Sequence, residues 1–322
     1  MRPRFKYAAM LAAGILALAG CGSAGASGGS GGKYKIGIIM FAGADQTSSQ
    51  AVKGYTATAR TLGYEVTTVD PQGQTDKAVA GMQTFVQKRV DLIVVTVFPS
   101  SSLTAGVRAA KAAGIPVVTF SGGTTDGVPV NYDSGTPQGL AIAKQLVHDT
   151  GGKGDLLILG YKSGLPCIGR EQALTRTLQG MSLMPSREEV PIPGQIEAST
   201  RFTQAFLAKH PAGGAGPAVW GCFDDPALGA IAAIKQAGRK DVKVYGVNGQ
   251  PGAIKAVKDG DMSATVWLDL YAAATDAAKN TAKYIKAGAD AEPVDIPIPY
   301  ELINKDNVDR FIKDHPGALK GQ

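Results

Sequence analysis

Residues 75–98 read TDKAVAGMQTFVQKRVDLIVVTVF, in which an amphipathic segment over 75–89 runs into a β-branched apolar segment over 91–98. The first segment has the periodicity of a helix, whereas the second is short and almost continuously apolar. A strand that is apolar on both faces is typical of a parallel sheet that helices cover on both sides. This unit therefore predicts an α/β fold.

The same alternation extends along the chain in both directions. A first series is completed by strand-like runs at 35–40, 64–70 and 116–121. A second series follows, with strands expected at 154–160, 188–193, 217–222, 242–247 and 263–267. Two such series predict two Rossmann-like lobes, each a doubly wound parallel sheet. Neither series contains a Gly-x-Gly-x-x-Gly fingerprint or a P-loop, and no cofactor is predicted.

The composition limits the class of protein. With 322 residues, 44% of them hydrophobic and only 3 cysteines, the chain is neither a disulfide-stapled mini-protein nor wholly disordered. Lys and Arg exceed Asp and Glu by 6, and this excess falls to 3 once Arg2, Arg4 and Lys6 are set aside as part of a segment expected to be removed. So mild an excess, with no basic run after residue 33, predicts no nucleic-acid partner.

The first 32 residues have the pattern of an export signal followed by a tether. Basic residues precede an apolar stretch, 7–20, that is too short for a comfortable membrane span and leads into Leu18-Ala19-Gly20-Cys21. This ending resembles the bacterial lipobox, so residues 1–21 are expected to be a lipoprotein signal peptide with Cys21 as the lipid anchor. The alternative is a small cysteine at the end of an ordinary hydrophobic segment. Residues 22–32 contain only Gly, Ala and Ser, which predicts a flexible tether.

Several segments resemble the periplasmic sugar-binding proteins of the ribose and galactose type, which supply ATP-driven importers. Besides 75–98, they are 109–118 (AAKAAGIPVV), 227–230 (ALGA) and 255–260 (KAVKDG), in the same order as in that family. The resemblance covers nearly everything from residue 33 to about residue 311. Soluble repressors share this fold but carry a helix-turn-helix where this chain has the export signal, which excludes a repressor.

The resemblance implies a type I periplasmic binding protein, with two lobes joined by a three-strand hinge and the ligand held between the carboxyl ends of the two sheets. The N-terminal lobe would comprise 33–134 and 268–296, and the C-terminal lobe 135–267 and 297–322. The protein would be a monomer on the outer face of the cell membrane. It would capture a small neutral carbohydrate or polyol by hinge closure and deliver it to an ABC permease and its ATPase. A sensory receptor for a less polar or signalling molecule is the alternative.

The resemblance also implies where the ligand groups of the N-terminal lobe lie, which is in loops that follow the strands. They are Phe41, Asp45 and Gln46 after the first strand, Phe98 after the third and Ser121 after the fourth. The two phenyl rings could stack on a sugar face or serve as core side chains, and both alternatives stay open. At Ser121 the family often carries an Asp-Arg pair, which this chain lacks.

On the C-terminal lobe, Arg170 aligns with the family's ligand arginine, a surface or cap role being the alternative. Phe223 and Asp224 stand where relatives have Asn-Asp. Asp224 could equally cap the helix that follows it.

Three further candidates follow later strands of the same lobe. Asn248 replaces a family aspartate, and Trp267 and Asp269 flank a leucine that replaces the usual glutamine. Charged hydrogen-bonding groups are thus exchanged for an amide and apolar surface. The pocket is therefore expected to reject the standard pyranose arrangement and to prefer a furanose, a smaller polyol, a deoxy or substituted sugar, or a less polar molecule.

Cys167 and Cys222 each follow a predicted strand of the C-terminal lobe, in loops expected at the same sheet edge. Outside the cytoplasm two such thiols can form a disulfide, and two separate buried thiols are the alternative. The three histidines show no metal-ligand spacing, so no metal site is predicted. Nothing groups a catalytic set of side chains, and no enzyme is predicted.

Overall fold

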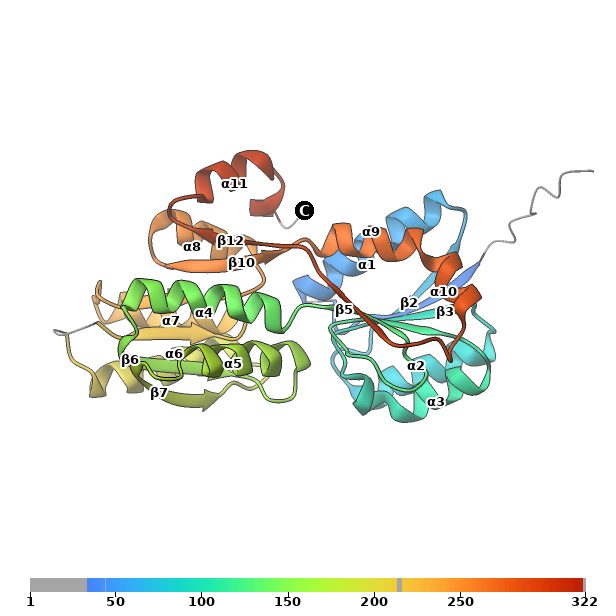
Figure 1. The fold of residues 1–322 in the computed structure, drawn as a ribbon, viewed down its shortest axis with the longest axis horizontal. Helices are drawn as coiled ribbons and strands as arrows, with labels where there is room; N and C mark the ends of the chain where they lie inside the picture. Colours follow the sequence, from blue (N-terminus) through green and yellow to red (C-terminus); the bar gives the residue numbers. More distant parts are fainter. Residues whose placement is uncertain (1–33, 44, 213–215, 321–322) are drawn as a thin grey trace, which may run out of the picture. The chain divides into compact units, whose positions relative to one another are not determined.

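The computed structural model describes residues 34–43, 45–212 and 216–320. The expected signal peptide, Cys21 and the tether lie outside the described residues. The described chain forms two α/β lobes, each built on a six-stranded sheet (Figure 1). The predicted fold class is confirmed.

The first sheet is entirely parallel. Its spatial order is β11 (Val294–Pro297), β5 (Val130–Asp133), β4 (Val117–Phe120), β3 (Leu92–Thr96), β1 (Lys35–Ile39) and β2 (Glu65–Val69). Five helices accompany it: α1 (Gln46–Thr61), α2 (Thr75–Gln87), α3 (Thr104–Ala112), α9 (Leu270–Lys279) and α10 (Thr281–Ala287). A 3-10 turn at Ser100–Leu103 precedes α3.

The middle strand β3 shows why the apolar run in the sequence is continuous. All five of its residues are buried, and successive side chains point to opposite faces. Leu92 and Val94 pack in the core that contains α1 and α9, whereas Ile93 and Val95 pack in the core beneath α2 and α3 (Figure 1). A strand covered on both faces therefore has no polar side.

The second sheet is parallel except for β12, which pairs antiparallel with β10. Its spatial order is β12 (Tyr300–Asn304), β10 (Ala264–Leu268), β9 (Lys243–Tyr245), β8 (Ala218–Gly221), β6 (Lys153–Gly160) and β7 (Ser182–Glu189). Its helices are α4 (Thr136–Thr150), α5 (Leu165–Thr177), α6 (Gln195–Lys209), α7 (Asp224–Gln236), α8 (Pro251–Asp259) and α11 (Val308–Asp314), with a final 3-10 turn at Ala318–Lys320.

The strand expected at 188–193 was misplaced. The structure has β7 at Ser182–Glu189, where most residues are exposed. This strand lies at the sheet edge and contains Pro185, which is tolerated there because an edge strand leaves one side of its backbone unpaired. An edge strand with polar side chains lacks the apolar run that marked the other strands.

The chain passes between the two sheets three times: after β5, after β10 and between β11 and β12. The three crossings are hydrogen-bonded to one another. The backbone N–H of Ile298 donates to the carbonyl of Asp133 (2.9 Å), and that of Asp269 donates to the carbonyl of Pro299 (2.9 Å). In addition, the buried Gln138 donates from Nε2 to the carbonyl of Ile298 (3.2 Å). Within the described ranges, no helix combines the length and the apolar character that crossing a bilayer requires.

Gly139 allows α4 to approach α5 closely. A Cβ atom at Gly139 would lie 2.4 Å from Cα of Arg170 and 2.9 Å from its carbonyl oxygen, and neither backbone atom can rotate away. Gly139→Ala is therefore expected to lower the free energy of unfolding by about 1–3 kcal/mol, measured by urea denaturation. The matched control is Gly252→Ala in α8, where the new Cβ would meet only the two methyl groups of Leu228, at 3.3 and 4.0 Å. Equal stability of the two variants would contradict this packing.

Candidate functional site

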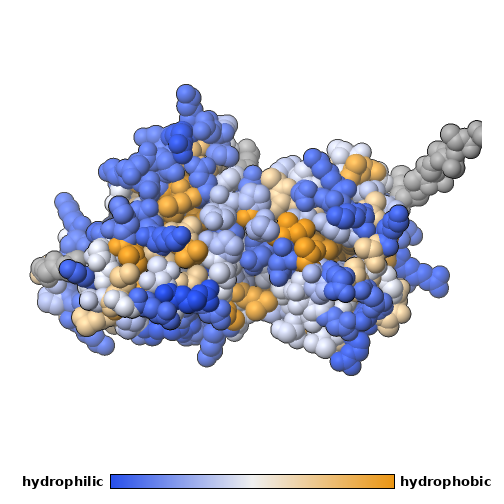
Figure 2. Space-filling view, viewed as in Figure 1, coloured by the Kyte–Doolittle hydropathy of each residue, from blue (hydrophilic) through white to orange (hydrophobic). Residues whose placement is uncertain are grey.

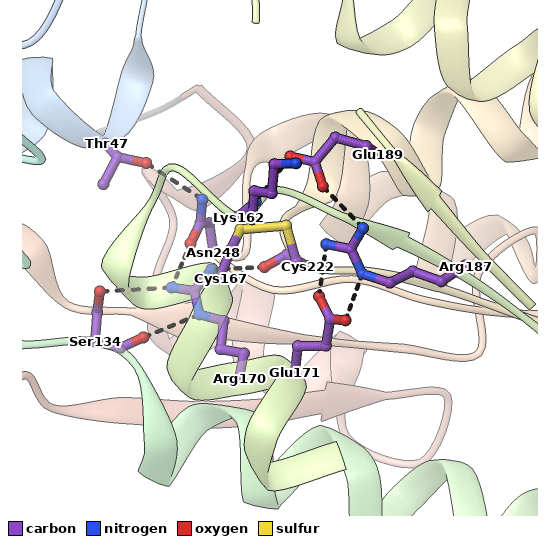
Figure 3. Close-up of a disulfide and its surroundings, with 10 residues drawn as sticks. All are labelled: Thr47, Ser134, Lys162, Cys167, Arg170, Glu171, Arg187, Glu189, Cys222 and Asn248. Carbon is purple, nitrogen blue, oxygen red and sulfur yellow. Dashed lines mark hydrogen bonds and ion pairs between the residues drawn. A yellow bond between two sulfur atoms is a disulfide. The ribbon is translucent and has the colours of Figure 1, made fainter. Parts of the chain in front are cut away.

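Arg170 lies in the second turn of α5, and its side chain is only 2% exposed. Its guanidinium donates from Nε to the carbonyl of Ser134 (2.9 Å), from Nη1 to the carbonyl of Cys222 (2.8 Å) and from Nη2 to Oδ1 of Asn248 (3.0 Å) (Figure 3). The acceptors come from three separate segments: the crossing after β5, the loop after β8 and the loop after β9. The structure thus brings two of the predicted residues, Arg170 and Asn248, into direct contact.

The guanidinium is held as a buried cation. Burial lowers the pKa of Arg170 to about 10, and the negative charges of Asp224 and Asp133 partly oppose that shift. The side chain therefore stays charged at neutral pH. Besides these two carboxylates, carbonyl and amide oxygens accept its hydrogen bonds, and such bonds are strong in a buried setting.

Two more hydrogen bonds extend this set of residues toward the other lobe. The side-chain nitrogen Nδ2 of Asn248 donates to Oγ1 of Thr47 in α1 (3.4 Å), and the hydroxyl groups of Ser121 and Ser134 lie 2.6 Å apart. We call Thr47, Ser121, Ser134, Arg170 and Asn248 the Arg170 cluster (Figure 3 shows all of it except Ser121). The cluster joins residues of the first sheet's lobe to residues of the second sheet's lobe.

Thr47 and Ser134 were not among the predicted site residues. Thr47 had a signal in the sequence, since it directly follows Gln46, whereas Ser134 follows strand β5, which was not among the expected strands. Small hydroxyl side chains are common in loops, however, and only the bonds to Asn248 and Arg170 set these two apart.

Asp224 is fully buried beside the cluster. It accepts hydrogen bonds from the backbone N–H of Gln250 (2.7 Å) and from the hydroxyl of Thr265 (2.7 Å). Burial raises the pKa of Asp224 to about 7, and the negative charge of Asp225 acts in the same direction. Its side chain does not cap α7, because the N-cap residue is the half-buried Phe223, which makes no side-chain capping bond.

Asp45 and Gln46 form the start of α1. Asp45 is the N-cap residue, and its carboxylate accepts from the backbone N–H of Ser48 (2.7 Å). Burial raises the pKa of Asp45 to about 6, and the charge of Asp225, from the other lobe, contributes to that rise. Gln46 is half-buried in the first turn, next to Thr47.

The aromatic candidates lie in different surroundings. The rings of Phe41 and Phe98 are 5.0 Å apart, Phe41 being half-buried and Phe98 only 2% exposed in the core under α2 and α3. The ring of Trp267 packs on Phe311 (5.2 Å) and on His315 (4.6 Å).

The structure does not bring the side chains of Phe98, Trp267 and Asp269 into the Arg170 cluster. Phe98 and Trp267 pack in the lobe cores, and Asp269 caps α9 by accepting from the backbone N–H of Ala272 (2.9 Å). The backbone of Trp267 does form a β-bridge with Asn248.

Cys167 and Cys222 form a disulfide with a Cα–Cα distance of 5.2 Å (Figure 3). The bond joins the first turn of α5 to the residue after β8.

Two surface cavities lie outside the cluster. One, of about 920 Å³, is lined by residues of α4 and β12, including the exposed Leu140 and Tyr300, and by Asp133 of β5. The other, of about 380 Å³, lies beside α5 and β7. On the face seen in Figure 2, polar residues predominate and apolar residues form separate patches. In the part of the chain that the structure describes, no group of three or more His, Cys, Asp or Glu side chains is arranged to hold a metal.

The raised pKa of Asp45 predicts how the free energy of unfolding changes with pH. A folded-state pKa of about 6, above the ordinary value of 3.8, means that folding favours the protonated carboxyl. This contribution to the free energy of unfolding is present below about pH 4 and is lost as the pH rises through 6. Asp45→Asn keeps a capping side chain without the charge. It should be more stable than the wild type at pH 7.5, and this advantage should shrink toward pH 4.5, measured by urea unfolding.

Asp269→Asn, at the N-cap of α9, controls for the change of cap residue itself. The raised pKa of the Asp45 carboxyl would be contradicted if the difference in free energy of unfolding between Asp45→Asn and the wild type stayed constant from pH 4.5 to 7.5.

Comparison with known proteins gives a consistent set of relatives. A family model described as a periplasmic binding protein domain matches residues 36–290. The ribose import binding protein of Bacillus subtilis is 27% identical over 217 residues, covering 66% of this chain and 69% of the relative. The xylitol-binding protein of Mycolicibacterium smegmatis is 26% identical, covering 96% of this chain and 88% of the relative.

A solved structure agrees with these relatives. An ABC transporter solute-binding protein from Agrobacterium vitis, crystallised with bound allitol, is 27% identical. It superposes with a TM-score of 0.80 and covers 88% of this chain and 99% of its own.

Proposed function

Because this chain belongs to the family of periplasmic binding proteins, we propose that it captures a small sugar or polyol outside the cytoplasm for an ABC importer. It is a binding protein rather than an enzyme, as are the relatives named above. The observation that carries the proposal is the Arg170 cluster, in which a buried guanidinium donates to two backbone carbonyls and to the amide of Asn248, and Asn248 in turn donates to the hydroxyl of Thr47 in the other lobe.

The chemistry of the cluster suits a neutral polyhydroxy ligand. Ser and Thr hydroxyls both donate and accept hydrogen bonds, the amide of Asn248 does the same from two atoms, and Arg170 donates only. A sugar hydroxyl needs such a mixture, because it too both donates and accepts. The contact of Asn248 with Thr47 is long, at 3.4 Å, so a ligand hydroxyl placed between them would replace a weak bond with two stronger ones.

We assign the ligand-binding groups to Ser121, Arg170 and Asn248, with Gln46 and Phe223 beside them. Gln46 adjoins Thr47, and Phe223 adjoins the carbonyl of Cys222 that Arg170 binds. Asn248 and Phe223 replace groups that relatives of the pyranose-binding type carry. The preferred ligand is therefore a polyol, a furanose or a substituted pentose rather than a standard pyranose.

We further propose that binding closes the two lobes about the three crossings. A ligand that touches Asn248 and the start of α1 at once interacts better with the closed form than with the open one. Moving the population from about 1:99 to 99:1 needs about 5.5 kcal/mol of differential binding free energy. The ranges 33–134 with 268–296 and 135–267 with 297–322 would move as the two bodies.

The sequence supports a lipid anchor at Cys21, through which the protein would be tethered to the outer face of the membrane. Residues 18–21 carry the resemblance to a lipobox on which this proposal rests. Cys21→Ser should release the protein from the membrane fraction of cells that express it. Retention of this variant in that fraction would contradict the anchor.

The proposed function is tested by thermal unfolding against D-ribose, xylitol, ribitol, allitol, myo-inositol and D-glucose. At a ligand concentration 100 times Kd the expected stabilisation is about 2.7 kcal/mol, a clear rise in Tm. At least one polyol or pentose should produce it and be recovered chemically unchanged. If none of these compounds moved Tm and a non-carbohydrate did, the assigned ligand class would be wrong.

A further inference from the structure

The disulfide and Arg170 meet at the same two segments of the chain. Cys167 and Arg170 are three residues apart in α5, so they lie on one face of the helix, one turn apart. Cys167 is bonded to Cys222, and the carbonyl of Cys222 accepts a hydrogen bond from Arg170 Nη1 at 2.8 Å (Figure 3). One residue of the loop after β8 is thus held by α5 twice, once covalently and once by the guanidinium.

We propose that the Cys167–Cys222 disulfide is a positioning device for Arg170, one that fixes its guanidinium against the carbonyl of Cys222 and the amide of Asn248 before any ligand arrives. This inference deepens the proposed function, and its main test needs no ligand. Arg170 has a long side chain with several rotatable bonds, so its guanidinium stays in place only if its acceptors do. The disulfide holds the Cα atoms of the two cysteines 5.2 Å apart and thereby fixes one of those acceptors relative to α5.

The contacts on the outer side of α5 do not perform this task. There, Glu171 accepts from Arg187 Nε at 2.5 Å and from Nη2 at 3.2 Å, which joins α5 to strand β7. These groups are partly exposed, and β7 is an edge strand on the far side of β6 from β8. The ion pairs can therefore keep α5 on the sheet without fixing the loop that contains Cys222.

The start of α5 also needs an external restraint. Its N-cap residue is Gly164, which has no side chain to bond the free N–H groups of the first turn, and the exposed Leu165 follows it. The disulfide is attached at Cys167, within this first turn. Its loss is expected to loosen the turn and, one turn further on, the side chain of Arg170.

The alternative is a disulfide that stabilises the lobe only by restricting the unfolded chain. In that case Arg170 would keep its bonds in the folded protein after the disulfide is removed. The positioning role and the purely unfolded-state effect predict different exchange rates of the Arg170 Nε proton with water. This proton is buried and bonded to the carbonyl of Ser134 at 2.9 Å.

The experiment is ¹⁵N NMR of arginine side chains in the wild type and in Cys167→Ala/Cys222→Ala. The exchange rate of the Arg170 Nε proton should rise at least tenfold without the disulfide. Arg239 is the matched control, because it also bonds from Nε (to Asp241, 2.7 Å) and from Nη1 (to the carbonyl of His210, 2.8 Å) in the same lobe, yet is linked to neither cysteine. Its exchange rate should change less than twofold.

Wild-type protein reduced with dithiothreitol supplies a second measurement if the double variant does not fold. Unchanged exchange of the Arg170 proton in a folded protein that lacks the disulfide would overturn the proposal. A parallel rise for Arg239 would also overturn it, since it would show general loosening of the lobe.

Binding of D-ribose, xylitol and allitol gives an additional readout. Where one of them binds, loss of the disulfide should lower the affinity for it at least tenfold when Arg170 is present. In Arg170→Lys the same loss should lower the affinity less than twofold. If none of the six compounds of the thermal screen binds, the proposed function fails, whereas the exchange measurement still decides the positioning role.

Discussion

Arg170→Met is expected to weaken the binding of the best sugar or polyol ligand at least 100-fold and to lower the free energy of unfolding by about 3–5 kcal/mol. The substitution keeps an unbranched apolar stem but removes every donor. It leaves the carbonyls of Ser134 and Cys222 and Oδ1 of Asn248 without the partner they have now. Each buried polar group left unpaired costs about 1–3 kcal/mol. Isothermal titration and urea unfolding measure the two effects.

Two variants separate the role of Arg170 in binding from its role in folding. Arg170→Lys keeps the charge but cannot reach three acceptors in a planar arrangement, so it should bind at an intermediate level. Arg239→Met removes an arginine that also makes hydrogen bonds in the same lobe but lies outside the cluster, and it should leave affinity unchanged. Undiminished binding by Arg170→Met would show that the ligand site lies elsewhere.

Cys167→Ala/Cys222→Ala is expected to lower the free energy of unfolding by about 4 kcal/mol. The sequence separation of 55 residues sets this value, because a longer closed loop restricts the unfolded chain more. Urea denaturation in oxidising buffer measures the loss. Wild-type protein unfolded with dithiothreitol present should show a midpoint well below that of the oxidised protein but above that of the variant, because its buried thiols still fill the space that the alanines leave.

The stability lost with the disulfide bond can be separated from the stability lost when two buried sulfur atoms are removed. Both cysteines are buried, so removing two sulfur atoms alone also costs stability. That packing term is absent from reduced wild-type protein, whose thiols still fill the space. If reduction left the midpoint of unfolding unchanged, the disulfide would make no contribution to stability.

The fold could be predicted because each lobe repeats a simple pattern. A buried parallel strand such as β3 must be apolar on both faces, and its covering helix must be amphipathic. Strand β7 escaped this reasoning because it lies at an edge, where burial does not constrain the side chains. The edge strand β2 is also largely exposed, but it was predicted because its residues are β-branched (EVTTV), a composition that β7 (SLMPSREE) lacks.

The candidate site was predictable in part. Arg170 and Asn248 were found by their resemblance to positions of a known family, and the structure joins them by a hydrogen bond. The roles of the other candidates depended on surroundings that no local pattern encodes. Trp267 stands beside Leu268 in the sequence, yet its ring packs on Phe311, more than forty residues away.

The sequence by itself determined the α/β class and the two-lobe organisation, because hydrophobic periodicity is a local property, whereas Arg170 was singled out by resemblance to a known family. Only the tertiary structure decided which groups hold Arg170 and what sets the pKa of Asp45. Thr47 meets Asn248 across 201 positions of sequence, and the charge of Asp225 reaches Asp45 from the other lobe. Contacts between distant segments depend on how helices and sheets pack, and burial and charge act through space rather than along the chain.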